Sequence, residues 1–229
     1  MKPILLSFAR RFLQKISPHV YFLCGPLLAS MLAAQMPHNI EPEFLPVVGE
    51  TAKENLRFRG VLEQHYDSSC ALATAATLLQ LYWHVAITEK ELLNQAFPKL
   101  KERELDEESR MNMLKLQNLI EAQGFQTKGF KMDLQQLHRA VKQFGPVVLH
   151  YEKPTTHFAL LLGVVDGYFV VADSARGIET LSARQLSKRR SPLVLLVTSQ
   201  QYQLQQAYRD EILQRAKARI IRLERMHEW

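Results

Sequence analysis

The fold is decided by the stretch Gln64-His65-Tyr66-Asp67-Ser68-Ser69-Cys70 and by the mainly apolar run 71–83 that follows it. Apolar residues recur along this run with helical spacing, and serines stand directly before it, where a helix N-cap is expected. We therefore predict a helix from Cys70 to about His84, capped by Ser68 or Ser69. This prediction places a thiol at the start of an apolar helix.

Three more helices are predicted further along the chain. Thr88 and Glu91 form a capping-box pattern that begins a helix ending near Phe97. The other two cover about 111–123 and 133–144, and a glycine follows each of them as a helix stop. The charged stretch 99–110, between the helix ending near Phe97 and the helix at about 111–123, is expected to be a solvated loop or a helix end.

Short apolar, β-prone runs separated by turn residues dominate the second half of the chain. Asp166-Gly167 between two of these runs is a strong hairpin signal. Because helices come first and an antiparallel sheet follows, we predict an α+β fold in which N-terminal helices pack on the sheet. The expected strands are 58–62, 125–132, 147–151, 157–165, 168–173 and 193–198.

The two ends of the chain differ from this central part. Residues 35–56 are rich in proline and predict an extended lead-in to a domain at 57–199. In the tail 200–229, apolar residues recur at steps of three or four opposite a face rich in Arg and Gln, which predicts a long amphipathic helix. This helix either packs on its own domain or docks to a partner or a membrane.

Residues 1–34 have the composition of a targeting segment. Basic residues precede the mainly apolar stretch Val20–Ala34, whose 15 residues suit the core of a secretory signal. A membrane span needs about 20 apolar residues. We expect a signal peptide that directs the chain to the periplasm, with cleavage near Ala33 or Ala34. An uncleaved N-terminal membrane anchor is the alternative.

The net charge does not indicate a nucleic-acid partner. The formal charge is +6, but four basic residues and no acidic residue lie in the first 34 positions. The remaining 25 basic and 23 acidic side chains nearly balance, so a binding surface for nucleic acid is not expected. The histidines show no spacing typical of metal ligands, and we expect neither a metal site nor a cofactor.

Cys70 is a candidate nucleophile. Signal cleavage would remove Cys24 and leave Cys70 as the one cysteine of an exported protein, where a thiol without a function is at risk of oxidation. A helix N-terminus favours the thiolate, which is the reactive form. Gln64, in the loop ahead of the helix, and the Cys70 backbone N–H are candidate oxyanion donors. The simpler interpretation of Cys70 is a buried structural cysteine.

His157 and Asp173 are the candidate base and its partner. His157 begins one apolar strand run and Asp173 ends the next, so a hairpin at Asp166-Gly167 would bring both to the same open end of the strand pair. There Asp173 could orient the His157 ring, as in a catalytic triad. Taken singly, each residue has a simpler interpretation: a structural histidine and a turn aspartate. His65 is a weaker candidate for the base because it lies too near Cys70 in sequence.

Taken together, Gln64, Cys70, His157 and Asp173 resemble the pattern of the bacteriocin-processing, papain-like leader peptidases, which cut after paired glycines. That family has a Gln six residues before its Cys, a His opening a strand, and an Asp about sixteen residues later. The resemblance covers about 59–198. It implies a papain-like cysteine peptidase fold and a Cys-His-Asp mechanism with Gln64 as oxyanion donor.

Two departures concern the residues beside the predicted triad. The family usually has Asp-Cys-Gly where this chain has Ser69-Cys70-Ala71, and Asp-Pro where this chain has Asp173-Ser174. Both leave the catalytic groups in place, and both weaken any transfer of double-glycine specificity to this chain.

As a stand-alone chain with an export signal, it looks more like the accessory peptidases of functional-amyloid (Fap) secretion systems than like a peptidase domain fused to an exporter. The resemblance implies an exported cysteine endopeptidase whose substrate is a secreted or amyloid-system polypeptide, such as a fibre subunit or a secretion-system component. The alternative is a non-catalytic, peptidase-like module that binds a client segment during secretion.

Overall fold

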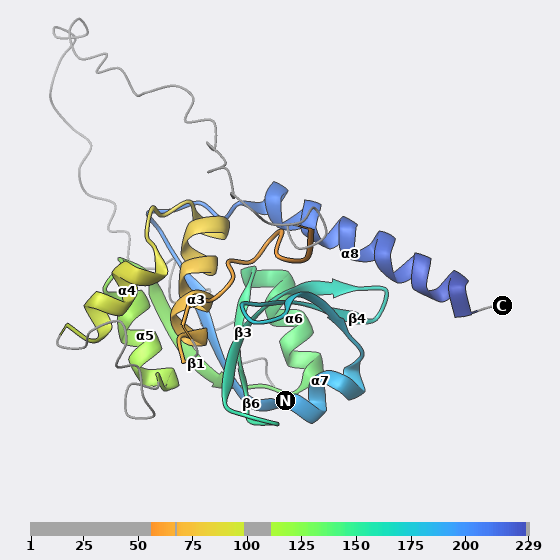
Figure 1. Ribbon diagram of the computed structural model, residues 1–229, viewed down its shortest axis with the longest axis horizontal. Coiled ribbons are helices and arrows are strands. Elements are labelled where there is room, and N and C mark those ends of the chain that lie inside the picture. The colour runs from red at the N-terminus through yellow and green to blue at the C-terminus, as the bar shows by residue number, and fades with distance from the viewer. Residues whose placement is uncertain (1–55, 67, 99–110, 228–229) are drawn as a thin grey trace, which may run out of the picture. The chain divides into compact units, whose positions relative to one another are not determined.

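The computed structural model describes residues 56–66, 68–98 and 111–227, which all lie in the compact unit Val48–Trp229 (Figure 1). The expected signal peptide or anchor, nearly all of the lead-in and the charged stretch 99–110 lie outside the described residues. Among the described residues, no helix is both long and apolar enough to span a membrane.

A six-stranded antiparallel sheet forms the centre, with the strand order β1-β6-β2-β3-β4-β5. β3 and β4 form the hairpin predicted at Asp166-Gly167, and Asp166 adopts a φ of 47° in its turn. The strands are β1 (Gln126–Lys131), β2 (Val147–Tyr151), β3 (His157–Val165), β4 (Tyr168–Asp173), β5 (Gly177–Leu181) and β6 (Arg190–Thr198).

Helices cover both faces of this sheet. Alternate side chains of each strand point to opposite faces, so Val148 and Leu160 join one apolar cluster while Val147 and Leu161 join the other. The first cluster packs against α3 (Cys70–Ala76), η1 (Thr77–Tyr82), α4 (Glu89–Ala96), α5 (Met113–Glu121) and α8 (Gln206–His227). The second packs against α6 (Leu134–Phe144) and α7 (Ala183–Arg189). The predicted α+β class is confirmed.

The helix that begins at Cys70 differs from its prediction in two ways. It continues from α3 into a π-helical turn, η1, and ends at Tyr82 instead of near His84. Ser69 occupies the N-cap position, but its hydroxyl donates to the Tyr66 carbonyl oxygen at 2.7 Å instead of accepting from the helix. Ser69 therefore holds the preceding loop and leaves the first N–H groups of α3 without a side-chain cap.

The predicted strand at 58–62 was wrong. The backbone turns at Gly60, whose φ is 105°, and the N–H of Val61 donates to the Phe58 carbonyl. Backbone groups of this segment are hydrogen-bonded to side chains of η1 instead of to a neighbouring strand. Thr77 Oγ1 accepts from Leu62 N at 3.0 Å, and Tyr82 Oη donates to Gly60 O at 2.7 Å.

Strand β5 and helix α7 were not predicted. Both are short and largely polar, so neither carries a hydrophobic pattern. The basic stretch 188–190 ends α7 and begins β6. Arg189 forms an ion pair with Glu179 of β5 at 2.9 Å, which ties these elements together.

Helix α8 begins at Gln206, later than the predicted start, and packs on the sheet through Ile212, Ala216 and Ile220. Its packing on its own domain is therefore confirmed for this part. Leu223 and Met226 in its last turns are exposed, and Figure 1 shows the helix continuing past the sheet toward the C-terminus.

Candidate active site

His157 and Asp173 meet at the open end of the β3–β4 hairpin. The His157 ring donates from Nε2 to Asp173 Oδ1 at 2.9 Å, and the backbone N–H of Ala175 donates to the same oxygen at 2.9 Å. The Asp173 side chain is 0% exposed and that of His157 is 16% exposed. The two residues thus form a largely buried pair, as the hairpin prediction required.

The Asp173 carboxylate stays charged in spite of its burial. Burial alone would raise its pKa, but the bond from His157, the positive charge of that ring and the Ala175 N–H lower the pKa below its usual value. Its second oxygen, Oδ2, is buried and has no hydrogen-bond partner among the described residues.

Cys70 is brought to this pair by the packing of α3 on β3. Thr74, one helical turn after Cys70, donates from its hydroxyl to the carbonyl of Phe158, the neighbour of His157, at 3.2 Å. The Cys70 side chain lies close enough to the His157 ring to raise the pKa of that ring, both as a hydrogen-bond partner and through its charge. The sulfur, the imidazole and the carboxylate therefore form one continuous chain of contacts.

The electrostatics of His157 follow from these two neighbours. Burial lowers the pKa of its ring, but the hydrogen bonds and negative charges of Asp173 and Cys70 outweigh burial and raise the pKa to about 9. His157 is accordingly an imidazolium at neutral pH. A positively charged neighbour is typical of the surroundings of reactive cysteines.

Gln64 lies beside the same end of β4, joined to it through Ser174. Its backbone N–H donates to the Ser174 carbonyl at 3.0 Å, and the Ser174 hydroxyl donates to its side-chain Oε1 at 3.2 Å. Its Nε2 donates to the Tyr66 carbonyl at 3.1 Å. Four sequence-predicted residues are thus linked in space: Cys70 to His157, His157 to Asp173, and Gln64 to the residue after Asp173.

Two residues near the site were not singled out from the sequence. Ser174 was noted only as a departure from the family pattern, yet its hydroxyl holds the Gln64 amide. Tyr151 lies opposite His157 on β2, with ring centroids 6.1 Å apart, and its buried hydroxyl has no hydrogen-bond partner among the described residues. In the sequence, Tyr151 is one more residue of an apolar strand run, and no motif there indicates a role in the site.

His65, the weaker candidate for the base, is engaged elsewhere. Its Nδ1 lies 2.9 Å from Oε2 of the buried Glu89, at the start of α4. The His65 side chain is 78% exposed. Its ring partner is Glu89, and the geometry favours His157 as the partner of the thiol.

The arrangement of a thiol on a helix start, a strand-edge imidazole and a buried carboxylate agrees with the comparison to known families. Residues 58–202 match the peptidase C39 family, which is more than half of the chain. The chain belongs to this family. The matched range includes all four candidate residues and ends before α8 begins.

Individual relatives agree with this assignment. The chain is 25% identical over 146 residues to the probable functional amyloid protease FapD of Pseudomonas aeruginosa. The match covers 64% of this chain and 63% of that relative, so it spans somewhat less than two-thirds of the relative's length.

A solved structure shows the same fold. The peptidase domain of Streptococcus ComA, a bi-functional ABC transporter, is 16% identical and covers 62% of this chain and 99% of that domain, with a TM-score of 0.52. A double glycine motif protease in complex with its leader peptide is 18% identical, covers 62% of this chain and 94% of its own, and has a TM-score of 0.48. The fold is that of papain-like C39 peptidase domains, as the resemblance implied.

Proposed function

We propose that this chain is a cysteine endopeptidase with Cys70 as nucleophile, His157 as general base and acid, and Asp173 as the residue that orients His157. The observation that carries the proposal is the chain of contacts from Cys70 through His157 to the buried Asp173. Membership of the peptidase C39 family supports it.

The proposed reaction begins with attack of the Cys70 sulfur on a peptide carbonyl carbon. The carbonyl oxygen becomes an oxyanion, which accepts hydrogen bonds from the Cys70 backbone N–H and from the Gln64 amide. The peptide C–N bond then breaks as His157 gives its proton to the departing amine. Water, deprotonated by His157, attacks the thioester and releases the acid and the free thiolate.

The substrate proposed is a secreted or amyloid-system polypeptide. Support comes from the similarity to FapD, which is named as a probable functional amyloid protease, and from the export signal expected at the N-terminus. We place the activity in the periplasm for the same reason, with the N-terminal segment either removed or kept as an anchor.

The first test is cleavage of candidate fibre subunits and secretion-system components by the full chain. Cys70→Ala should abolish cleavage with little change in melting temperature, because it replaces a half-buried thiol by a small apolar side chain. A variant that cleaves at the normal rate would refute the proposal.

Thiol labelling separates the peptidase from a non-catalytic client-binding module. The imidazolium of His157 should make Cys70 react rapidly with iodoacetamide at neutral pH. His157→Ala should slow this reaction strongly, whereas His138→Ala, which changes an exposed histidine on α6, should not. Slow labelling that is equal in all three proteins favours the binding module.

A further inference from the structure

A groove of about 380 Å³ runs between α8, the edge strand β5 and the turn that holds Arg57 and Arg59. Its floor is apolar, because Ile178 of β5 and the buried side chains of Ile212 and Ala216 line it. None of the residues of the candidate active site lines this groove.

The rim of the groove is strongly positive. No acidic side chain is among the described residues that line it. Glu211 contacts two of the rim arginines, with its Oε1 3.0 Å from Arg59 and 2.9 Å from Arg215. The rim arginines, all exposed, are Arg57, Arg59, Arg215, Arg219 and Arg222. Positive charge is therefore in clear excess over one shared carboxylate.

The groove is connected to the candidate active site through Arg57. The Arg57 side chain donates from Nε to the Arg176 carbonyl at 2.6 Å, three residues after Asp173. Gly177, the next residue, lies so close to Arg57 that an added Cβ would stand 2.5 Å from the Arg57 carbonyl oxygen. A polypeptide in the groove would thus lie beside the loop that leaves Asp173.

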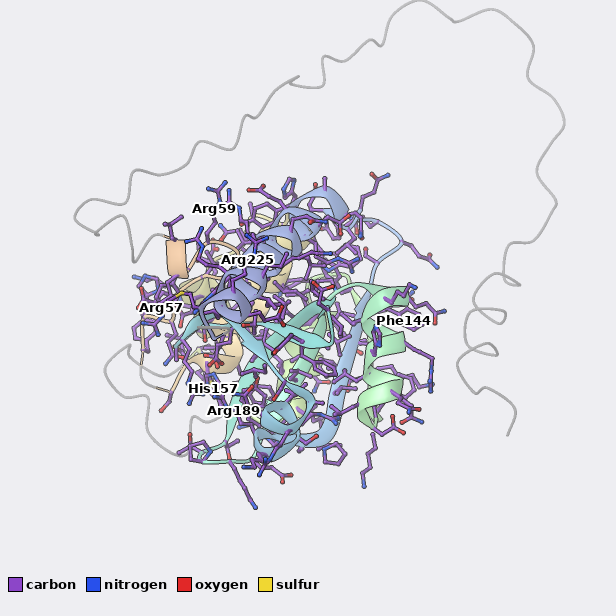
Figure 2. The ribbon with its side chains drawn as sticks, turned by 90° about the vertical axis from the view of Figure 1, so that its right-hand side faces the viewer. Arg57, Arg59, Phe144, His157, Arg189 and Arg225 are labelled. Atoms are coloured by element: carbon purple, nitrogen blue, oxygen red, sulfur yellow. The ribbon has the colours of Figure 1, made fainter. Side chains whose placement is uncertain are left out.

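The wall formed by α8 sets this groove apart from the shared peptidase domain. The family match ends at 202, and α8 begins at Gln206. Figure 2 looks toward the C-terminal end of α8, with Arg57 and Arg59 on one side of the view and Phe144 of α6 on the other. The groove is accordingly a feature of this chain's additional helix.

We propose that this groove binds an acidic segment of the polypeptide substrate, with its carboxylates on the rim arginines and its apolar side chains on the floor. The inference rests on the proposed function, because the occupant is the polypeptide that the site would cut. Arginine is suited to this task, since its planar guanidinium pairs with carboxylates through two parallel hydrogen bonds.

A peptide fits this groove better than a lipid surface does, because β5 is an edge strand. β5 pairs only with β4 among the described strands, and its Ile178 and Thr180 line the groove. Arg219 already donates to the Ile178 carbonyl on that strand at 3.3 Å. An edge strand beside an apolar floor is a known place for an extended peptide to bind through backbone hydrogen bonds and side-chain pockets.

The test measures binding without catalysis, so it does not depend on whether the site cleaves. Full-length Cys70→Ala protein is titrated, by fluorescence anisotropy, into two fluorescein-labelled peptides of the same apolar sequence. One peptide carries glutamate at every charged position and the other carries lysine. We expect the glutamate peptide to bind, with an affinity that falls as salt is added, and the lysine peptide not to bind.

A charge-reversed groove provides the matched comparison. Arg215→Glu, Arg219→Glu and Arg222→Glu together should weaken binding of the glutamate peptide by about tenfold or more, which is about 1.4 kcal/mol. Arg139→Glu with Lys142→Glu, two exposed positions on α6, should leave its affinity unchanged. Thermal unfolding of both variants checks that the fold is intact.

Three results would overturn the inference. These are failure of the glutamate peptide to bind, equal binding of the two peptides, and unchanged affinity in the folded groove variant. Flotation with phosphatidylglycerol vesicles tests the other occupant: vesicle binding that the groove variant loses, without peptide binding, assigns the groove to a membrane surface. If the unmodified chain cleaves no candidate substrate but the glutamate peptide still binds, the result counts against the proposed function alone.

Discussion

At the scale of single residues, the His157 ring has two neighbours, the Cys70 side chain and the buried Asp173 carboxylate. Burial lowers its pKa, and Asp173 and Cys70 together raise it to about 9. The ring therefore keeps its proton through neutral pH and can give it to a departing amine. As pH rises through about 9, the ring loses that proton, and kcat/KM should fall with it.

Asp173→Asn tests this role of His157 by changing the pH at which kcat/KM falls. The change removes the negative charge and weakens the hydrogen bond that raise the pKa of His157, while burial continues to lower it. The alkaline limb of the kcat/KM profile should therefore move to lower pH, and the maximal rate should fall. An alkaline limb that does not move would show that His157 is not the group that titrates.

Ser174 gives a second prediction at the residue scale. Its hydroxyl holds Gln64 Oε1 at 3.2 Å, a contact that the family's usual proline could not make. Ser174→Ala should lower kcat, because the Gln64 amide would no longer be held in place. The effect should be smaller than that of Gln64→Ala, which removes one oxyanion donor and should lower kcat by about 10²–10³. In the Gln64→Ala background, Ser174→Ala should have no further effect on kcat. Additive losses would contradict this coupling.

At the scale of elements, the turn after β4 joins the candidate active site to the turn that holds Arg57 and Arg59. Gly177 has a φ of 83°, and a Cβ there would meet the Arg57 carbonyl oxygen at 2.5 Å. Gly167 has a nearly equal φ of 82° in the β3–β4 turn, with no atom within 4 Å of an added Cβ. The two glycines therefore have nearly the same φ but different surroundings.

Gly177→Ala should consequently destabilise the fold more than Gly167→Ala. Both variants carry the strain of a positive φ, but only Gly177→Ala adds a clash with backbone, for which overpacking costs about 1–3 kcal/mol. Urea unfolding measures the difference in free energy directly. Equal losses in the two variants would mean that the turn at Arg57 moves away at no cost.

The elements that the sequence predicted correctly carry strong local signals. The capping boxes at Thr88 and Asp133 form in the structure, and the Asp166-Gly167 turn joins two long apolar strands. α7 has a capping box too, between Ser182 and Gln185, but Leu186 is its single buried residue. Without apolar periodicity, such a signal is too common to identify a helix, and the partner strand β5 was missed with it.

At the scale of the whole molecule, the candidate site combines one relation that a local pattern can predict with one that it cannot. His157 and Asp173 lie at the open end of a hairpin whose turn, Asp166-Gly167, can be predicted from the sequence. Cys70 reaches His157 only because α3 packs on β3, a contact between segments 84 residues apart at Thr74 and Phe158. No periodicity fixes which face of which strand a helix will cover, so that relation came from the family resemblance.

Helix α8 gives the final prediction, since its two halves differ in burial. Ile212, Ala216 and Ile220 are 1%, 4% and 3% exposed, whereas Leu223 and Met226 are 43% and 68% exposed. Truncation after Gln205 would remove the first three from the core. Each buried isoleucine is worth about 1.5–3 kcal/mol, so that variant should unfold at much lower urea or not fold at all.

Truncation after Arg222 should change the unfolding free energy much less, because the apolar side chains it removes, Leu223 and Met226, are exposed. It also keeps every rim arginine of the groove, so binding of the glutamate peptide should persist. Urea unfolding and fluorescence anisotropy on the same preparation report both properties. A large loss of stability would place the last turns of α8 against another part of the protein, and a loss of binding alone would extend the groove beyond Arg222.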